Sequence, residues 1–247
     1  MRTPATLAAA TGAAMLLVSC TCASGPRTAI PTYSAPRAAT APVIDGRLDD
    51  AIWERAPWTE PFVNTMDGSA GAPETRAKIA WDDTAIYVAF DVADTYLRCT
   101  LSGDDPHLWE QDTVEIMLDP GGDGRNYFEL QLSPTNQIFD TRYDSRRVPQ
   151  PFGHVDWDSG MRGAAVTRGT PNDGEGDEGY TAELAILWTA FAAGDPPAAP
   201  PRAGEEWRIA LYVLDAIRNG QGACGWSPPL VGDFHVPDRF GRVTFTD

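Results

Sequence analysis

Two stretches of the sequence place aromatic side chains beside carboxylates. Residues 106–119 (PHLWEQDTVEIMLD) contain Trp109 and Glu115, and residues 234–241 (FHVPDRFG) begin with Phe234. The apolar C–H face of a pyranose ring stacks on an exposed aromatic side chain, and a neighbouring carboxylate accepts hydrogen bonds from the hydroxyls of the ring. The sequence therefore predicts a sugar site in which Trp109 and Phe234 hold the ring. The predicted sugar-binding residues are Trp109, Glu115, Phe234, Glu110, Asp112 and His235.

The familiar signatures of catalysis are absent from the sequence. No GxSxG, HExxH or GxxxxGK[ST] motif occurs. Residues 174–179 (GEGDEG) match GxGxxG, but their carboxylates would repel a pyrophosphate and a strand follows them, so we interpret them as an acidic hairpin turn. Asp112 and Glu115 form the best-placed carboxylate pair, yet three residues apart on a strand they point to opposite faces. We therefore predict no catalytic residue.

Residues 119–126 (DPGGDGRN) offer oxygen ligands at a spacing that could hold a calcium ion. The predicted ligands are Asp119, Asp123 and Asn126. The alternative is a Gly-rich hairpin turn, because the EF-hand pattern and its twelfth-position Glu are missing. No CxxC pair or Cys/His cluster occurs, which argues against a zinc site. Cys99 and Cys224 could form a disulfide in an oxidising compartment.

The N-terminal residues are typical of an export signal. One Arg precedes an Ala/Leu-rich stretch that closes with Leu-Val-Ser-Cys20. This ending is similar to a bacterial lipobox and predicts a signal peptide over residues 1–19 and lipidation of Cys20, with ordinary cleavage near Ala23 as the alternative. Residues 20–41 are rich in Ala, Pro, Ser and Thr and predict a tether, although Thr32–Ala35 could begin the first strand.

The charge balance restricts the partners of the exported chain. There are 35 acidic and 19 basic residues, which give a formal net charge of −16. So acidic a surface repels nucleic acid and anionic lipid. We expect attachment to the membrane through the lipid anchor alone, most favourably at the outer membrane or cell surface.

The rest of the chain has the alternating pattern of β-strands. Val114, Ile116 and Leu118 alternate with more polar residues, and turn residues separate most candidate strands. Many short strands without long helices predict an all-β fold, an antiparallel β-sandwich of the immunoglobulin-like or jelly-roll type with short peripheral helices, over residues 42–247. The further predicted strands are 75–81, 86–92, 127–132, 137–144, 163–168, 180–186, 207–214 and 242–245. The predicted helical segments are 49–56 and 187–193, and the tryptophans assigned to the core are Trp53, Trp81, Trp188 and Trp207.

These features together resemble the family 9 carbohydrate-binding modules and their wider relatives. The similarity is carried by residues 42–53 (PVIDGRLDDAIW), 78–92 and 109–119 (WEQDTVEIMLD), and by Phe240-Gly241 before the last strand, in the order of the family. It extends over about residues 32–247. The resemblance implies a β-sandwich, often with structural calcium, that binds sugars between two aromatic side chains.

The resemblance also assigns roles to individual residues. Trp109 falls on one binding aromatic and Glu115 on a sugar-contacting carboxylate. Phe234 stands where the second aromatic is usually Trp. Where the best-known members have an Arg on the strand after Asp119, this chain has Glu129.

The sequence therefore predicts a non-catalytic, lipid-anchored carbohydrate-binding protein that acts beside partner glycosidases in carbohydrate catabolism. Three alternatives stay open. The first is a haem or electron-transfer sandwich, with axial ligands drawn from Met66, Met117, His154 and His235. The second is a glycoside-acting hydrolase with an unrecognised carboxylate pair. The third is a structural surface protein that has lost its ligand.

Overall fold

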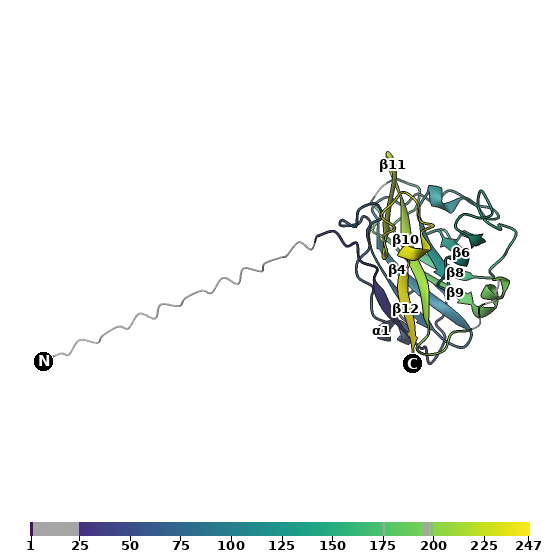
Figure 1. The fold of residues 1–247 in the computed structure, drawn as a ribbon. Helices are drawn as coiled ribbons and strands as arrows, with labels where there is room; N and C mark the ends of the chain where they lie inside the picture. Colours follow the sequence, from purple (N-terminus) through teal and green to yellow (C-terminus); the bar gives the residue numbers. More distant parts are fainter. Residues whose placement is uncertain (2–24, 175, 195–197, 199) are drawn as a thin grey trace.

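The computed structural model describes residues 1, 25–174, 176–194, 198 and 200–247. Over these residues the chain folds into two β-sheets that pack face to face, with short helical turns at the periphery (Figure 1). The predicted signal peptide beyond Met1 lies outside the described residues, as does the predicted lipidation site at Cys20.

The larger sheet has eight strands and the smaller sheet has four. Neighbouring strands run antiparallel, except that β1 and β12 pair in parallel. The larger sheet has the order β1 (Thr32–Pro36), β12 (Gly241–Thr246), β10 (Glu206–Ile217), β5 (Thr113–Asp119), β6 (Arg125–Leu132) and β7 (Ile138–Ser145), while β11 (Gly220–Gly225) pairs with β10 and with β2 (Val63–Asn64). The smaller sheet has the order β3 (Glu74–Trp81), β4 (Ala85–Ala93), β9 (Gly179–Leu187) and β8 (Arg162–Arg168).

The helical segments are short. The α-helix α1 (Ala51–Arg55) follows β1, and three 3₁₀ turns are formed by Leu108–Glu110, Trp188–Ala193 and Pro237–Arg239. The predicted segments 49–56 and 187–193 are thus confirmed as helical, one as a short α-helix and the other as a 3₁₀ turn. Among the described residues no helix combines the length and apolar character needed to cross a membrane.

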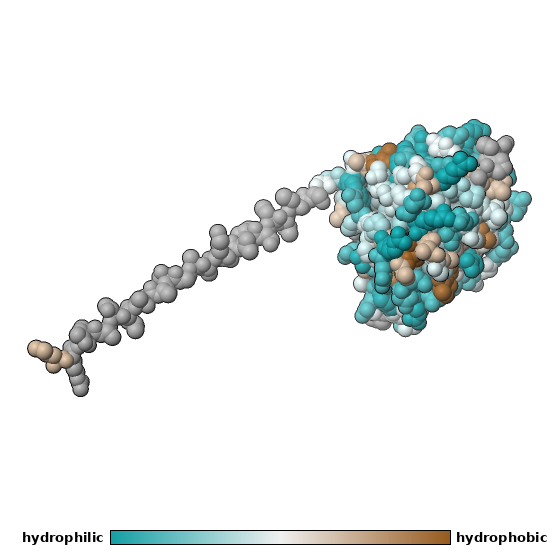
Figure 2. All heavy atoms as spheres, turned by 90° about the horizontal axis from the view of Figure 1, so that it is seen from below, coloured by the Kyte–Doolittle hydropathy of each residue, from teal (hydrophilic) through white to brown (hydrophobic). Residues whose placement is uncertain are grey.

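The core lies between the two sheets and confirms the alternating pattern. Val114, Ile116 and Leu118 point inward and are fully buried together with the inward residues of the smaller sheet, such as Val88 and Phe90. Burial of each such side chain contributes about 2 kcal/mol. The tryptophans assigned to the core, Trp53, Trp81, Trp188 and Trp207, are all buried. Elsewhere the surface is largely hydrophilic on the face drawn in Figure 2.

Part of the predicted tether belongs to the larger sheet. Residues 32–36 form β1, and the ring of Tyr33 is buried while its hydroxyl donates a hydrogen bond to the carbonyl of Pro57. The assignment of residues 20–41 to a tether is therefore wrong over this segment, and the alternative, a first strand beginning at Thr32, is confirmed. Alternate side chains of β1 are buried at the edge of the core. This burial stabilises the strand despite the Pro-rich composition of the segment.

The predicted disulfide between Cys99 and Cys224 is not formed. Both thiols are buried and free. The Sγ of Cys224 lies 3.4 Å from the carbonyl oxygen of Pro73 and 3.8 Å from Thr75 Oγ1. Burial raises the pKa of Cys99 to about 11 and that of Cys224 to about 12, so both stay protonated and unreactive at neutral pH.

Candidate functional site

A pocket of about 220 Å³ lies on the outer face of the larger sheet and brings the predicted aromatic and acidic residues together. Its lining includes Trp109, Glu115, Phe234 and His235, four of the six residues predicted for the sugar site. The strands supply the floor, and the segments before β5, after β7 and before β12 supply the walls. The two segments singled out in the sequence, residues 106–119 and 234–241, thus supply only part of the site.

The floor follows from the strand register. Glu115 on β5 faces Gln131 on β6, and Met117 faces Glu129. The residues between them, such as Ile116, point to the core. Because side chains alternate along a strand, the same alternation that buries Ile116 turns both glutamates outward.

The two walls are aromatic rings held by other rings. Trp109 stacks on His107 with ring centroids 4.3 Å apart, and its indole also contacts Phe139 and Phe152. Phe234 stacks on Tyr212 at 4.4 Å. Trp109 and Phe234 are only partly exposed. Supporting rings fix their orientation and reduce the entropy lost when a ligand stacks on them.

The side chain of Gln221 fixes the backbone under Trp109. Its Nε2 donates a hydrogen bond to the Trp109 carbonyl. Gln221 lies on β11, the hairpin partner of β10. This strand was not predicted, because the sequence GQGACG lacks the alternation of apolar side chains from which the other strands were inferred.

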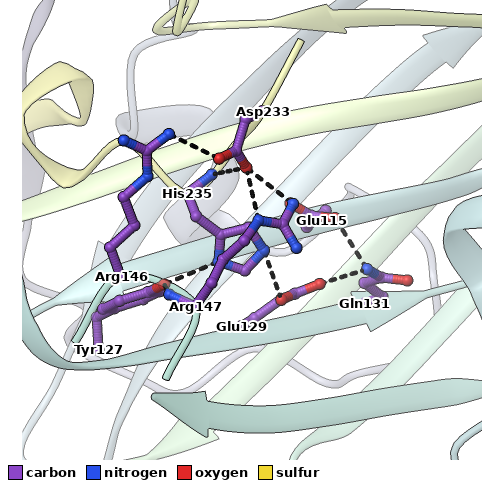
Figure 3. Close-up of polar contacts among 8 residues, drawn as sticks. All are labelled: Glu115, Tyr127, Glu129, Gln131, Arg146, Arg147, Asp233 and His235. Carbon is purple, nitrogen blue, oxygen red and sulfur yellow. Dashed lines mark hydrogen bonds and ion pairs between the residues drawn. The ribbon is translucent and has the colours of Figure 1, made fainter. Parts of the chain in front are cut away.

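The acidic floor is built around one amide. The Nε2 of Gln131 donates hydrogen bonds of 2.8 Å to Glu115 Oε2 and to Glu129 Oε1 (Figure 3). All three side chains are buried. The remaining oxygen of Glu115, Oε1, is buried without a hydrogen-bond partner among the described residues. Burial raises the pKa of both carboxyls, and for Glu115 the proximity of Glu129 raises it further.

Arg147 and Asp233 line one side of the pocket, and Arg146 completes their ion-pair network. Arg147 donates from Nε and Nη2 to Asp233 Oδ1, at 3.0 and 2.8 Å, and Arg146 donates to Asp233 Oδ2 at 2.8 Å (Figure 3). Although burial opposes ionisation, these hydrogen bonds hold the pKa of Asp233 well below its usual range. The guanidinium of Arg147 is therefore engaged by Asp233.

His235 is a neutral member of the site. Burial first, and the charge of Arg147 second, lower its pKa to about 3. Its Nδ1 lies 2.8 Å from the hydroxyl of Tyr127, and its Nε2 lies 3.6 Å from Glu129 Oε2, beyond hydrogen-bond distance. His235 thus contacts the acidic pair without neutralising it.

Glu110 and Asp112 do not line the pocket, in contrast to the prediction. The Glu110 side chain is 60% exposed and pairs with His107 at 3.6 Å. The carboxylate of Asp112 is turned inward, where it accepts hydrogen bonds from the backbone N–H groups of Arg98 and Ala216. Asp112 precedes the first residue of β5, so the alternation of the strand does not set its direction.

Residues 119–126 form the hairpin turn between β5 and β6 that was the alternative to a calcium site. Asp119 is fully buried, and its two oxygens accept hydrogen bonds from the backbone N–H groups of Gly122 and Gly124 at 3.0 and 2.9 Å. Asp123 accepts one from the N–H of Arg125, and Asn126 has a positive φ of 50°. Because the turn uses these carboxylates, its geometry favours a structural role over metal binding.

A different acidic cluster has the geometry of a cation site. Asp94, Asp112 and Asp215 are buried, and one carboxylate oxygen from each lies within 4.8 Å of the others. Burial raises the pKa of Asp112 to about 8 and of Asp215 to about 6, and the neighbouring carboxylate of Asp94 raises both further. Hard cations such as Ca²⁺ take carboxylate oxygens of this kind. These three residues fit the calcium that the family resemblance implies, and local sequence spacing could not identify them.

The side chains considered for haem do not converge. Met117 and His235 line the pocket, but both ring nitrogens of His235 face protein groups. His154 bonds to Asp144 at 3.0 Å, and Met66 is exposed. The contacts therefore favour the sugar site over an axial-ligand pair.

Several pocket residues were missed by sequence reasoning. They come from strands and loops that are separate in the sequence, and only the pairing of the strands brings them together. The missed lining residues include Met117, Phe139, Tyr143, Arg147, Phe152, Leu214 and Asp233. The alternation of residues 127, 129 and 131 on the strand after the 119–126 turn was the available signal for the floor.

The fold and site together define a β-sandwich module with an aromatic-walled, acidic pocket on its larger sheet. Residues 44–247 match the family described as carbohydrate family 9 binding domain-like. The chain belongs to this family.

Curated relatives carry this module within much longer proteins. The chain is 32% identical over 209 residues to endo-1,4-beta-xylanase A of Thermoanaerobacterium saccharolyticum, covering 83% of this chain and 15% of the relative. It is 31% identical over 209 residues to exoglucanase XynX of Acetivibrio thermocellus, covering 83% of this chain and 16% of the relative. The chain thus spans about one sixth of the length of these relatives.

Solved structures show the same fold. A family 9 carbohydrate-binding module from Caldicellulosiruptor kristjanssonii, in complex with cellotriose, superposes with a TM-score of 0.60 at 22% identity, covering 87% of this chain and 93% of that one. The structure of such a module from the same organism with glucose gives a TM-score of 0.58 at 21% identity, covering 87% of this chain and 95% of that one. These likenesses confirm the predicted antiparallel sandwich.

Proposed function

We propose that the chain binds carbohydrate, without transforming it, in the pocket between Trp109 and Phe234. The observation that carries the proposal is the convergence of two ring-supported aromatic walls on a floor with the buried, partly unpaired carboxylate of Glu115. A pyranose can place its C–H face on an aromatic ring and its hydroxyls on Glu115. Membership of the family and the glucose and cellotriose complexes of its structural relatives support this assignment.

The arrangement of the two glutamates favours binding over hydrolysis. A glycosidase places its two carboxyl groups on either side of the scissile bond. Here Glu115 and Glu129 lie on adjacent strands of one sheet and share the same amide donor, so both approach a ligand from the floor. The pocket can therefore orient a sugar but not flank one of its glycosidic bonds.

The predicted export signal supports a location at the cell surface for this binding activity. The Leu-Val-Ser-Cys20 sequence favours lipidation and display on the cell surface, where the module would hold glycans near glycosidases. We infer a supporting role in carbohydrate catabolism from this address and from the enzymes that carry related modules. Metabolic labelling with a fatty-acid analogue tests the anchor: Cys20→Ala removes the label if the inference is right, and retained label contradicts it.

Calorimetric titration of the full chain with glucose, cellotriose and xylo-oligosaccharides tests sugar binding. We expect saturable binding in the micromolar to millimolar range and a loss of about 2 kcal/mol in Trp109→Ala. Trp58→Ala is the matched control, because Trp58 is also partly exposed but packs on Arg76 and Lys78 outside the pocket. No binding by the folded chain across the panel, or equal losses in the two variants, contradicts the proposal.

A further inference from the structure

The pocket floor carries more negative charge than its surroundings neutralise. Glu115 and Glu129 are 2% and 5% exposed and share one amide donor, and the hydroxyl of Tyr143 also donates to Glu129. Of the described residues that line the pocket, Arg147 is the one permanent cation; it is bound to Asp233, and its charge only partly offsets the effect of burial on the two glutamates. His235 is neutral. Two buried carboxylates this close need a proton or a cation for stability.

One acceptor of the floor has no hydrogen-bond partner among the described residues. Glu115 Oε1 is buried and has no hydrogen-bond partner among the described residues, while Glu115 itself lines the pocket. Glu129 Oε2 has the Nε2 of His235 at 3.6 Å, too far for a hydrogen bond. Figure 3 shows both carboxylates beside the Gln131 amide. A ligand group with several donors and a positive charge matches these acceptors.

We propose that the preferred ligand is an amino sugar with a free, protonated amine, which places its ammonium group on Glu115 and Glu129. This inference rests on the proposed carbohydrate binding and specifies its ligand class. An ammonium group has three hydrogen-bond donors and no acceptor. It can therefore donate to oxygens of both carboxylates without placing a lone pair against them. Hydrogen bonds between charged partners are about twice as strong as neutral ones.

The walls of the pocket accept the same ligand. The faces of Trp109 and Phe234 carry the negative quadrupole that attracts cations as well as sugar C–H groups. The sugar ring stacks on the aromatic walls while its amine reaches the floor. A single ring thus uses both features of the pocket.

Neutral sugars and metal ions match the floor less well. A hydroxyl donates one hydrogen bond and brings no charge, so one carboxyl has to remain protonated. An N-acetyl group also lacks charge and adds bulk. A bare metal ion is disfavoured, because among the described residues the cluster of three acidic or imidazole ligands is Asp94, Asp112 and Asp215, none of which lines the pocket.

The test is calorimetry of the full chain at pH 6.5 with glucosamine, glucose and N-acetylglucosamine. We expect glucosamine to bind at least tenfold more tightly than glucose, with N-acetylglucosamine weakest. Glu129→Gln, which keeps the shape of the side chain, should reduce the ratio of glucosamine to glucose affinity to about two or less. Glu110→Gln is the matched control, since Glu110 is exposed outside the pocket, and it should keep the wild-type ratio.

Glucose and glucosamine binding within twofold of each other in the wild-type chain overturns the inference and leaves the proposed carbohydrate binding intact. A ratio that is the same in Glu129→Gln and in the wild-type chain overturns it as well. Failure of every sugar, including cellotriose, to bind the folded chain contradicts the proposed function itself. The wild-type ratio decides the inference even if the Glu129→Gln chain does not fold.

Discussion

Among the buried acidic side chains of the described residues, two clusters differ in what surrounds them. At the pocket floor, Glu115 and Glu129 share the amide of Gln131, and one glutamate oxygen is left for a ligand. In the second cluster, the oxygens of Asp94, Asp112 and Asp215 converge on one another. The first cluster adjoins a pocket with aromatic walls, and the second has the ligand chemistry of a hard cation.

The direction of a carboxylate matters more to its role than its position in a motif. Asp112 and Glu115 are three residues apart in WEQDTVEIMLD, yet one joins the buried aspartates and the other lines the proposed sugar pocket. We therefore expect the two clusters to control separate properties: the aspartates the stability of the sandwich, and the glutamates the binding of ligand.

The largest expected effect is stabilisation by calcium. If the aspartate cluster binds Ca²⁺ in the folded state only, a concentration of 100 times the Kd adds about 2.7 kcal/mol to the free energy of unfolding. Thermal unfolding in calcium and in excess EDTA measures this difference. Equal melting temperatures under the two conditions would show that the cluster holds protons instead of a cation.

A pair of variants should separate the two clusters. Glu115→Gln removes a charged acceptor and should weaken sugar binding by about 2 kcal/mol, with the calcium dependence of the melting temperature retained. Asp215→Asn should abolish the calcium dependence and leave the sugar affinity within twofold. Calorimetry measures the sugar affinity of each variant, and thermal unfolding measures the calcium dependence of its melting temperature. A variant that changes both properties would contradict the separate roles of the two clusters.

Stability should fall with rising pH when calcium is absent. Burial raises the pKa of Asp215 to about 6 and of Asp112 to about 8, so the folded chain holds these protons more tightly than the unfolded chain. The stabilisation is complete below about pH 4 and is lost as the pH rises through 6 and 8, at no more than about 1.4 kcal/mol per unit for each carboxyl. Denaturant unfolding in EDTA between pH 4 and 8 checks the slope, which saturating calcium should flatten.

The smallest expected effect lies in the 119–126 turn. Asp123→Ala removes one hydrogen bond to the backbone N–H of Arg125 at an exposed position and should cost about 0.5 kcal/mol. The calcium dependence of the melting temperature should stay as in the wild type. A loss of that dependence would return the calcium site to this turn and contradict its assignment to the aspartate cluster.

Much of the fold could be predicted from the sequence, because alternation is a local property. The strands around Val88 and Ile116 alternate clearly, and each was expected near its observed position. The two-residue strand Val63–Asn64 pairs with β11, which is distant in the sequence, and β11 itself lacks apolar alternation although it forms a hairpin with β10. The parallel pairing of β1 with β12 likewise joins the two ends of the domain.

The site could be predicted only in part. Trp109, Glu115 and Phe234 stood out by residue type and family resemblance, and the structure brings them to one pocket. Arg147 and Asp233 are 86 residues apart, and their ion pair follows from the folded arrangement. The directions of Glu110 and Asp112 are set by the 3₁₀ turn and by backbone hydrogen bonds, which residue type does not reveal.

The most direct test of the central claim is a crystal structure of the chain with the sugar that binds most tightly in the calorimetric panel. We predict a ring between Trp109 and Phe234, with a donor group of the sugar within about 3 Å of a Glu115 oxygen. Ligand density at another hollow, such as the one lined by Phe191 and Trp207, with the Trp109 pocket empty, would contradict it.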